Sequence, residues 1–173
     1  DALPISMTKV SEVTVGSGGA ASIEFTSIPQ TGKDLLVLLS ARDTGSIGGA
    51  AFLYFNGNTS SSNYSYRHLN GSGSAATSTN FSGDAWYLWR AALSLSGDTA
   101  STFGNALAYI SNYTSATAKS ISSDGVTENN ATAAKQSIGA GLWNQTAAIT
   151  AIGLLAEGAN FAQNSTASLY IVS

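Results

Sequence analysis

The residues able to carry catalysis or to hold a metal are few in this chain. His68 is the only histidine among the 173 residues, and there is no cysteine. A metal site built on two or three imidazoles, a zinc–thiolate site, a thiol nucleophile and a disulfide are therefore excluded. A serine–histidine–acid triad needs a strained serine turn such as Gly-x-Ser-x-Gly. Gly16-Ser17-Gly18 and Gly71-Ser72-Gly73 are better interpreted as loop glycines beside serines. We predict no catalytic residue and no cofactor, with His68 as a structural or surface group.

Carboxylates are the remaining catalytic candidates, since the chain has ten Asp and Glu. Glycosidases use two carboxyl groups roughly 5–9 Å apart, and a β-sandwich can hold such a pair. The spacing does not select two of Glu24, Asp43, Asp84, Asp98, Glu128 and Glu157. A calcium site could draw on Asn56-Gly57-Asn58 or on Asp124-Gly125 with residues 128–130, but capped turns explain these residues better. We therefore predict no metal site.

Aromatic side chains offer a binding hypothesis in place of a catalytic one. Sugar sites combine aromatic faces with donors such as arginine, so the predicted glycan-binding residues are Tyr64, Tyr66, Arg67, Trp86 and Trp89. For any single ring the preferred interpretation is packing between two sheets. The eight Asn-x-Ser/Thr triplets would mean glycosylation in a eukaryotic secretory context, and Asn/Ser/Thr-rich loops are the plainer explanation.

Composition narrows the classes of partner. Charged residues make up 10% of the chain, far below the usual ~25%, and the net charge is −3. The seven Lys and Arg are scattered singly, so we expect neither a nucleic-acid partner nor attraction to anionic membranes. The longest apolar run is far below the ~18 residues of a membrane span. The first seven residues lack the features of a signal peptide, so none is expected there.

The elements that would position these residues are strands, and the clearest of them is predicted at residues 35–41. Five aliphatic residues stand in a row at 35–39, with Gly32 and Gly45 on either side. A run this short is typical of a strand buried on both faces. A helix is the rival, but the run is too short to be stable as one. We predict the central strand of an all-β domain.

Further strands are expected along the first half of the chain. Residues 10–15 and 21–26 are predicted to form an antiparallel hairpin. Residues 51–55 should end at an Asn56-Gly57 tight turn. Residues 64–69 are expected to place Tyr64, Tyr66 and His68 on one face, and residues 70–80 to form a long loop or a weak edge strand.

The second half gives a less uniform pattern. Residues 84–95 fit either a strand or a short helix, and residues 131–138 could be either. Strands are predicted over 103–111, 148–155 and 167–172. A further segment at 119–123 should lead into a turn at Asp124-Gly125.

Together these segments predict an all-β, antiparallel β-sandwich, jelly-roll-like, with about ten strands. We expect one domain over residues 1–173, with residues 1–9 as an N-terminal arm. The two most apolar strands, 35–41 and 148–155, should lie in the interior in opposed or neighbouring positions.

Structural motifs along nearly the whole chain carry a family resemblance. They are Ala21-Ser22-Ile23-Glu24-Phe25-Thr26-Ser27-Ile28-Pro29-Gln30, residues 34–42, Phe55-Asn56-Gly57, residues 63–67, Ile110-Ser111-Asn112-Tyr113, Lys119-Ser120, Leu142-Trp143, and residues 148–152, 158–162 and 165–170. The chain resembles a family of bacteriophage virion proteins, especially those of marine and cyanobacterial phages. That family usually ends its last strand in Leu-Tyr-Gly, whereas Ile171 follows Tyr170 here.

The resemblance implies a jelly-roll module on the surface of a phage particle, as a capsid decoration protein or a fibre or appendage subunit. The leading hypothesis is a non-enzymatic structural protein acting through assembly contacts. Its expected partners are further copies in a homo-oligomer, with a trimer favoured, other virion proteins and a host-surface glycan. The alternative is a lectin-like carbohydrate-binding module, and the third hypothesis is a glycan-degrading enzyme.

Overall fold

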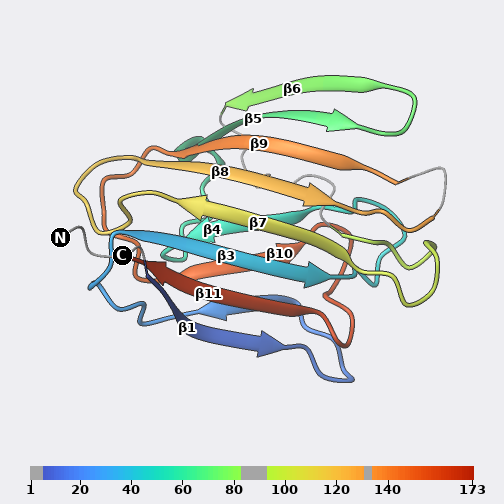
Figure 1. Cartoon of the computed structure of the whole chain (residues 1–173), viewed down its shortest axis with the longest axis horizontal. Coiled ribbons are helices and arrows are strands. Elements are labelled where there is room, and N and C mark those ends of the chain that lie inside the picture. Colours follow the sequence, from blue (N-terminus) through green and yellow to red (C-terminus); the bar gives the residue numbers. More distant parts are fainter. Residues whose placement is uncertain (1–5, 83–92, 131–133) are drawn as a thin grey trace.

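The computed structural model describes residues 6–82, 93–130 and 134–173. Its strands form two sheets that face each other, so the predicted antiparallel β-sandwich is confirmed (Figure 1). The large sheet holds, in spatial order, β1 (Met7–Thr14), β11 (Thr166–Val172), β3 (Asp34–Ala41), β7 (Gly104–Ile110), β8 (Lys119–Val126), β9 (Gln136–Trp143), β5 (Tyr64–Gly71) and β6 (Ala76–Ser82). The small sheet holds β2 (Ser22–Phe25), β10 (Ile152–Ala156) and β4 (Ala51–Phe55). A short 3-10 helix, Ser61–Asn63, precedes β5.

The core lies between the small sheet and one face of the large sheet, which we call the inner face. Leu35, Val37 and Leu39 of β3 point into it, and Ile152 and Leu154 of β10 meet them from the small sheet. The two apolar strands singled out in the sequence therefore belong to opposed sheets. Strand β10 begins at Ile152, so the predicted start at residue 148 was too early.

Burial of β3 on both faces was a wrong prediction. Its side chains alternate, so that Val37 is fully buried while Leu38 keeps 37% of its surface exposed on the outer face. The small sheet has three strands and covers the inner face only, and among the described residues no second layer covers the outer face.

Two local predictions were overturned by long-range pairing. Residues 10–15 and 21–26 do not form a hairpin, because β1 pairs with β11 in the large sheet and β2 pairs with β10 in the small one. The chain crosses between the sheets at residues 16–20. Asp124-Gly125 is no turn either: both residues lie inside β8, paired with Leu107 and Ala106 of β7.

Other predictions were confirmed. Asn56 and Gly57 have φ values of 52° and 67°, as a tight turn of the mirror-image type requires. The N–H of Asn58 closes that turn onto the carbonyl of Phe55 at 2.8 Å. Of the two alternatives for residues 70–80, the edge strand is present from Ala76: it is β6, which among the described strands pairs with β5 alone.

The remaining predictions concern segments at the margins of the described residues. Most of residues 84–95 lies outside the described part of the chain. The segment expected at 131–138 supplies the start of β9, a strand from Gln136. Residues 7–9, expected in an N-terminal arm, belong to β1 and pair with β11.

Candidate functional site: the outer face of the large sheet

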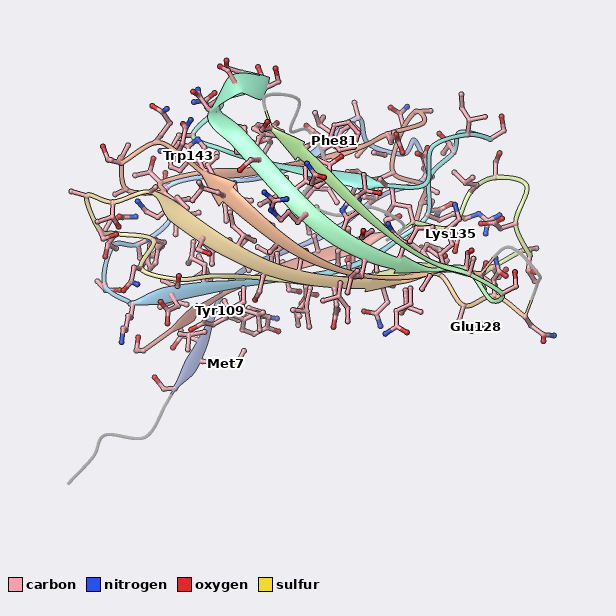
Figure 2. The ribbon with its side chains drawn as sticks, turned by 90° about the horizontal axis from the view of Figure 1, so that it is seen from above. Met7, Phe81, Tyr109, Glu128, Lys135 and Trp143 are labelled. Carbon is pink, nitrogen blue, oxygen red and sulfur yellow. The ribbon has the colours of Figure 1, made fainter. Side chains whose placement is uncertain are left out.

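The outer face of the large sheet gathers apolar side chains on the surface. Nine large apolar side chains are exposed among the described residues, and seven of them point outward from this sheet. They are Met7, Leu38, Leu69, Tyr109, Val126, Ile138 and Leu142. Figure 2 shows Met7 and Tyr109 on one side of the sheet, with Trp143 and Phe81 on the other. Exposed apolar patches of this extent are typical of surfaces that bind another molecule.

Strand periodicity places these side chains. In β7, β8 and β9, alternate residues enter the core, and the intervening ones point outward. The registers align Leu38 with Leu107 and Ile138 with Leu69, so apolar residues of neighbouring strands stand side by side across the face.

Most of the charged groups on this face have a partner within the chain. The ammonium of Lys9 donates to the Glu12 carboxylate at 3.1 Å, which raises the pKa of Lys9 and lowers that of Glu12. Asp34 accepts hydrogen bonds from the Tyr109 hydroxyl and from the Asn112 N–H. The bond to Asp34 raises the pKa of Tyr109.

Arg67 and Asp124 differ from those groups. Both are exposed on the outer face, and neither has a hydrogen bond or an ion pair to another described residue. They lie two strands apart, Asp124 on β8 and Arg67 on β5, with β9 between them. The registers place Asp124 opposite Ile138 and Arg67 opposite Ala140.

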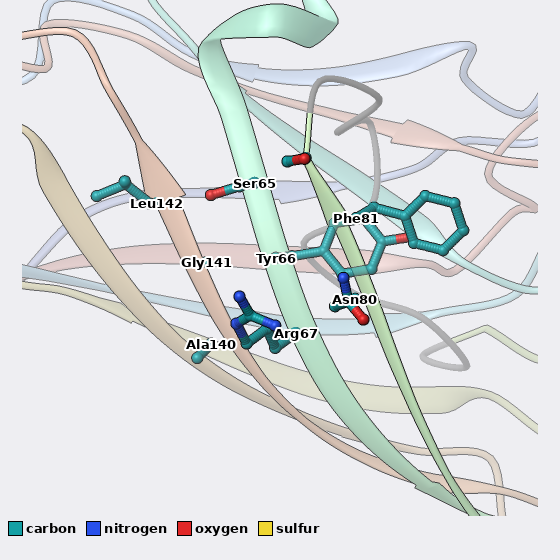
Figure 3. Close-up of a pocket in the computed structure, with 9 residues that line it drawn as sticks. Ser65, Tyr66, Arg67, Asn80, Phe81, Ala140, Gly141 and Leu142 are labelled. Carbon is teal, nitrogen blue, oxygen red and sulfur yellow. The ribbon is translucent and has the colours of Figure 1, made fainter.

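A shallow trough runs along the face where β9, β5 and β6 meet. Two adjoining hollows of about 300 and 400 Å³ form it, and both are lined by Arg67, Asn80 and Ala140. Figure 3 shows Arg67 between Ala140 of β9 and Asn80 of β6. Gly139 and Gly141 of β9 also line it, and the exposed Leu69 and Ile138 flank it.

The predicted glycan-binding residues are divided by this arrangement. Tyr64 and Tyr66 are buried toward the inner face, whereas Arg67, the next residue along the strand, points outward. The Tyr64 hydroxyl donates to the Asn58 carbonyl at 2.8 Å and accepts from the Phe55 N–H at 3.0 Å. Trp86 and Trp89 lie outside the described residues.

His68 shares the inner face with Tyr64 and Tyr66, as predicted. It is 5% exposed, and its ring stacks on that of Tyr66 with centroids 4.7 Å apart. Tyr66 also packs against Phe81 of β6, with centroids 5.2 Å apart. The imidazole therefore belongs to an aromatic stack beneath the trough floor.

Charged residues away from the outer face fasten loops through backbone groups. The Arg42 guanidinium donates to four carbonyl oxygens, those of Ser96, Asp98, Thr99 and Thr102, at 3.0–3.2 Å. The fully buried Asp43 carboxylate accepts from the N–H groups of Gly45 and Gly158, both at 2.7 Å.

In the described part of the chain there is no group of three or more His, Asp or Glu placed to hold a metal. Nor does any described helix have the length and apolarity needed to cross a bilayer.

Sequence reasoning missed the apolar outer face. A signal was present, because Leu36, Leu38, Leu107 and Tyr109 alternate with core residues in strands that are apolar on both sides. The run at 35–39 predicts a strand buried on both faces, and an uncovered binding face produces the same pattern.

Comparisons with known proteins do not place the chain in a family. No protein-family model matches the chain, and no curated protein does. Among solved structures, one match is to SCP-B, a member of the eqolisin family of peptidases in a complex with the tripeptide Ala-Ile-His, at 19% identity and a TM-score of 0.13. The match covers 82% of this chain and 63% of that chain, less than two thirds of the latter. At this TM-score the likeness carries no argument about fold or activity.

Proposed function

We propose that this chain is a non-enzymatic structural protein of a phage particle, a capsid decoration or fibre subunit, which works through assembly contacts. The observation that carries the proposal is the outer face of the large sheet, where seven exposed large apolar side chains gather. Leaving so much apolar surface in water is costly for a lone domain, at about 25 cal/mol per Å². Contact with a neighbouring subunit removes that cost.

The positions that carry the family resemblance support the same proposal. Asp34, Arg42, Asn56 and Lys119 stand in those motifs, and each uses its side chain to hold a loop through backbone groups. The Asn56 amide, for example, binds the carbonyl of Ala148 and the N–H of Thr150, both at 2.8 Å. The shared features therefore describe a rigid scaffold, which suits a particle component.

The test is to purify the particles of the phage that encodes this chain and to quantify their proteins by mass spectrometry. We expect the chain at a copy number in fixed ratio to the major capsid or fibre protein. Antibody-labelled particles in the electron microscope then separate a head position from a tail position. Absence of the chain from density-purified particles would refute the proposal.

A second candidate function, glycan recognition, is favoured by the trough. Arg67 and Asn80 bring planar polar groups to its wall, and Ser65 and Ser78 bring hydroxyls. A glycan array probed with the wild type and with Arg67→Ala tests this function. Hits lost in Arg67→Ala but kept in a Lys33→Ala control would support it, and an array without hits would reject it.

A further inference from the structure

We infer that a second copy of this chain docks on the outer face of the large sheet, held in register by two reciprocal Arg67–Asp124 ion pairs around a two-fold axis. The inference rests on the proposed function, in that it names the partner for the assembly face. It is carried by the exposed apolar side chains of the face and by two opposite charges that have no partner among the described residues.

The size of the face allows a modest dimer contact. Eight strands spaced ~4.8 Å apart, each presenting about seven residues at ~3.3 Å, span ~900 Å². A two-fold axis over β9, the sixth strand, lets about five of them, from β7 to β6, overlap their copies, or ~550 Å². A standard specific interface buries about 800 Å² on each partner, so this contact belongs with the weaker complexes.

The part of the face around β9 and β5 has an apolar core. Leu69 and Ile138 are the most exposed large apolar side chains on the face, at 61% and 58%, and they are register neighbours. Leu38 of β3 and Tyr109 of β7 form a second apolar group, separated from the first by the outward Ser122 and Asp124 of β8. Charged groups are depleted at the cores of protein interfaces, and among the described residues only Arg67 and Asp124 lie close to Leu69 and Ile138.

Those two charges are complementary and do not contact each other within the chain. The spacing of strands and residues puts their Cα atoms ~12 Å apart. No ion pair joins them in the structure. An opposite charge brought by a partner would satisfy each of them.

A two-fold axis makes both pairs at once. In a symmetric dimer, if Arg67 of one copy meets Asp124 of the other, the reverse contact follows. The midpoint between the two residues falls on β9 at Gly139, between the outward side chains of Ile138 and Ala140. The axis therefore crosses the face beside its most exposed apolar residues, which become the centre of the contact.

Charge reversal tests the inference without touching the core, because both side chains are exposed. The masses of the wild type, Arg67→Asp and Asp124→Arg are measured by sedimentation over a range of concentrations. We expect a wild-type dimer and, for each variant alone, a dimer dissociation constant raised about tenfold or more by the two like-charge contacts. Lys135→Asp, which changes the charge by the same amount at an exposed position beyond the end of the face, should dimerise as the wild type does.

The decisive sample mixes the two variants in equal amounts. One chain then presents Asp at both positions and the other presents Arg at both, so a heterodimer has two favourable pairs. We expect the mixture to regain the wild-type dissociation constant, and the double variant Arg67→Asp/Asp124→Arg to regain it as well. Circular dichroism spectra matching the wild type confirm that each variant is folded.

Three results would overturn the inference: a wild-type monomer at all concentrations, a homotrimer, or a dimer whose variants and mixture behave like the wild type. None of these would by itself refute the proposed function, because presence in purified particles is measured separately. A monomer that binds a saccharide through Arg67 would assign the trough to glycan recognition instead.

Discussion

The ammonium group of Lys119 lies 5.9 Å from the ring centroid of Trp143, and the two residues are register partners where β8 begins and β9 ends. Lys119 is fully buried with no carboxylate partner among the described residues. Its Nζ donates instead to the carbonyl oxygens of Ser115, Thr117 and Ala147. One buried cation thus ties two loops together beside an aromatic ring. Burial lowers the pKa of this lysine.

Replacing this cation tests its structural role. Lys119→Met keeps the length of the side chain and leaves three carbonyl groups without their donor. Unsatisfied buried polar groups cost about 1–3 kcal/mol each before relaxation, so we expect a net loss of about 2–3 kcal/mol in the free energy of unfolding. Urea denaturation measures it. Lys9→Met, at an exposed position, should change stability by less than about 0.5 kcal/mol, and equal losses in both variants would contradict the assignment.

Tyr64 should make the fold sensitive to alkaline pH. Burial raises its pKa from 10.0 to about 12. The unfolded chain therefore releases this proton at a lower pH than the folded one, so stability is full below pH 10 and falls as the pH rises to 12. The loss is about 1.4 kcal/mol for each pH unit in that window.

The comparison with Tyr64→Phe isolates this contribution, since other tyrosines titrate in both proteins. The variant loses two hydrogen bonds, which should cost about 1–2 kcal/mol at pH 7. Urea denaturation from pH 7 to 11.5 should show that difference shrinking above pH 10. A difference that stays constant with pH would rule out the raised pKa.

One-sided burial of β3 predicts opposite outcomes at adjacent positions. Val37 is fully buried against Ala108 and Leu169, so Val37→Asp places an unpaired charge in the core and should prevent folding. Leu38→Asp puts the same group on the outer face and should cost less than about 1 kcal/mol. Circular dichroism and thermal unfolding distinguish the two variants. An unfolded Leu38→Asp would mean that the outer face is needed for folding.

The planar guanidinium group of Arg42 should hold residues 96–102 in one conformation. Lysine cannot span the four carbonyl groups that the guanidinium contacts, so Arg42→Lys should release this loop. Amide hydrogen exchange in residues 96–102 is expected to accelerate about tenfold or more, at about 1.4 kcal/mol per tenfold, with β3 unchanged. Arg67→Lys serves as the matched control, and equal exchange in both variants would contradict the role of Arg42.

Period-two patterns predicted much of the fold because they depend only on neighbouring residues. Tyr64, Tyr66 and His68 were placed on one face correctly, and the Asn56-Gly57 turn follows from backbone conformations that few residue types adopt. Segment 35–41 was correctly identified as a strand, although it is third of eight in the large sheet and not its centre. Its outer face was not, because Leu36 and Leu38 look the same in sequence whether a layer of the same chain or another molecule covers them.

Features that depend on distant pairing could not be predicted. The Gly16–Gly19 segment suggests a turn, but only the pairing of β1 with β11 shows that the chain changes sheets there. Asp124-Gly125 favours a turn locally, and its partners on β7 and β9 override that preference. Arg42 and Lys119 bind backbone carbonyls, which every residue carries, so their targets leave no mark in the sequence.

Holding loops by their carbonyl groups has a consequence for how this protein can change over generations. Arg42 contacts residues 96–102, and Lys119 contacts residues 115–117, without recognising any loop side chain apart from the Thr102 hydroxyl. Asp98, Thr102, Ser115 and Thr117 make side-chain hydrogen bonds within these loops, so the positions open to substitution are the others, such as Thr99 and Ala100. Lineages under pressure to alter what they display could diversify those positions and conserve the two cations together with the side chains that shape the loops.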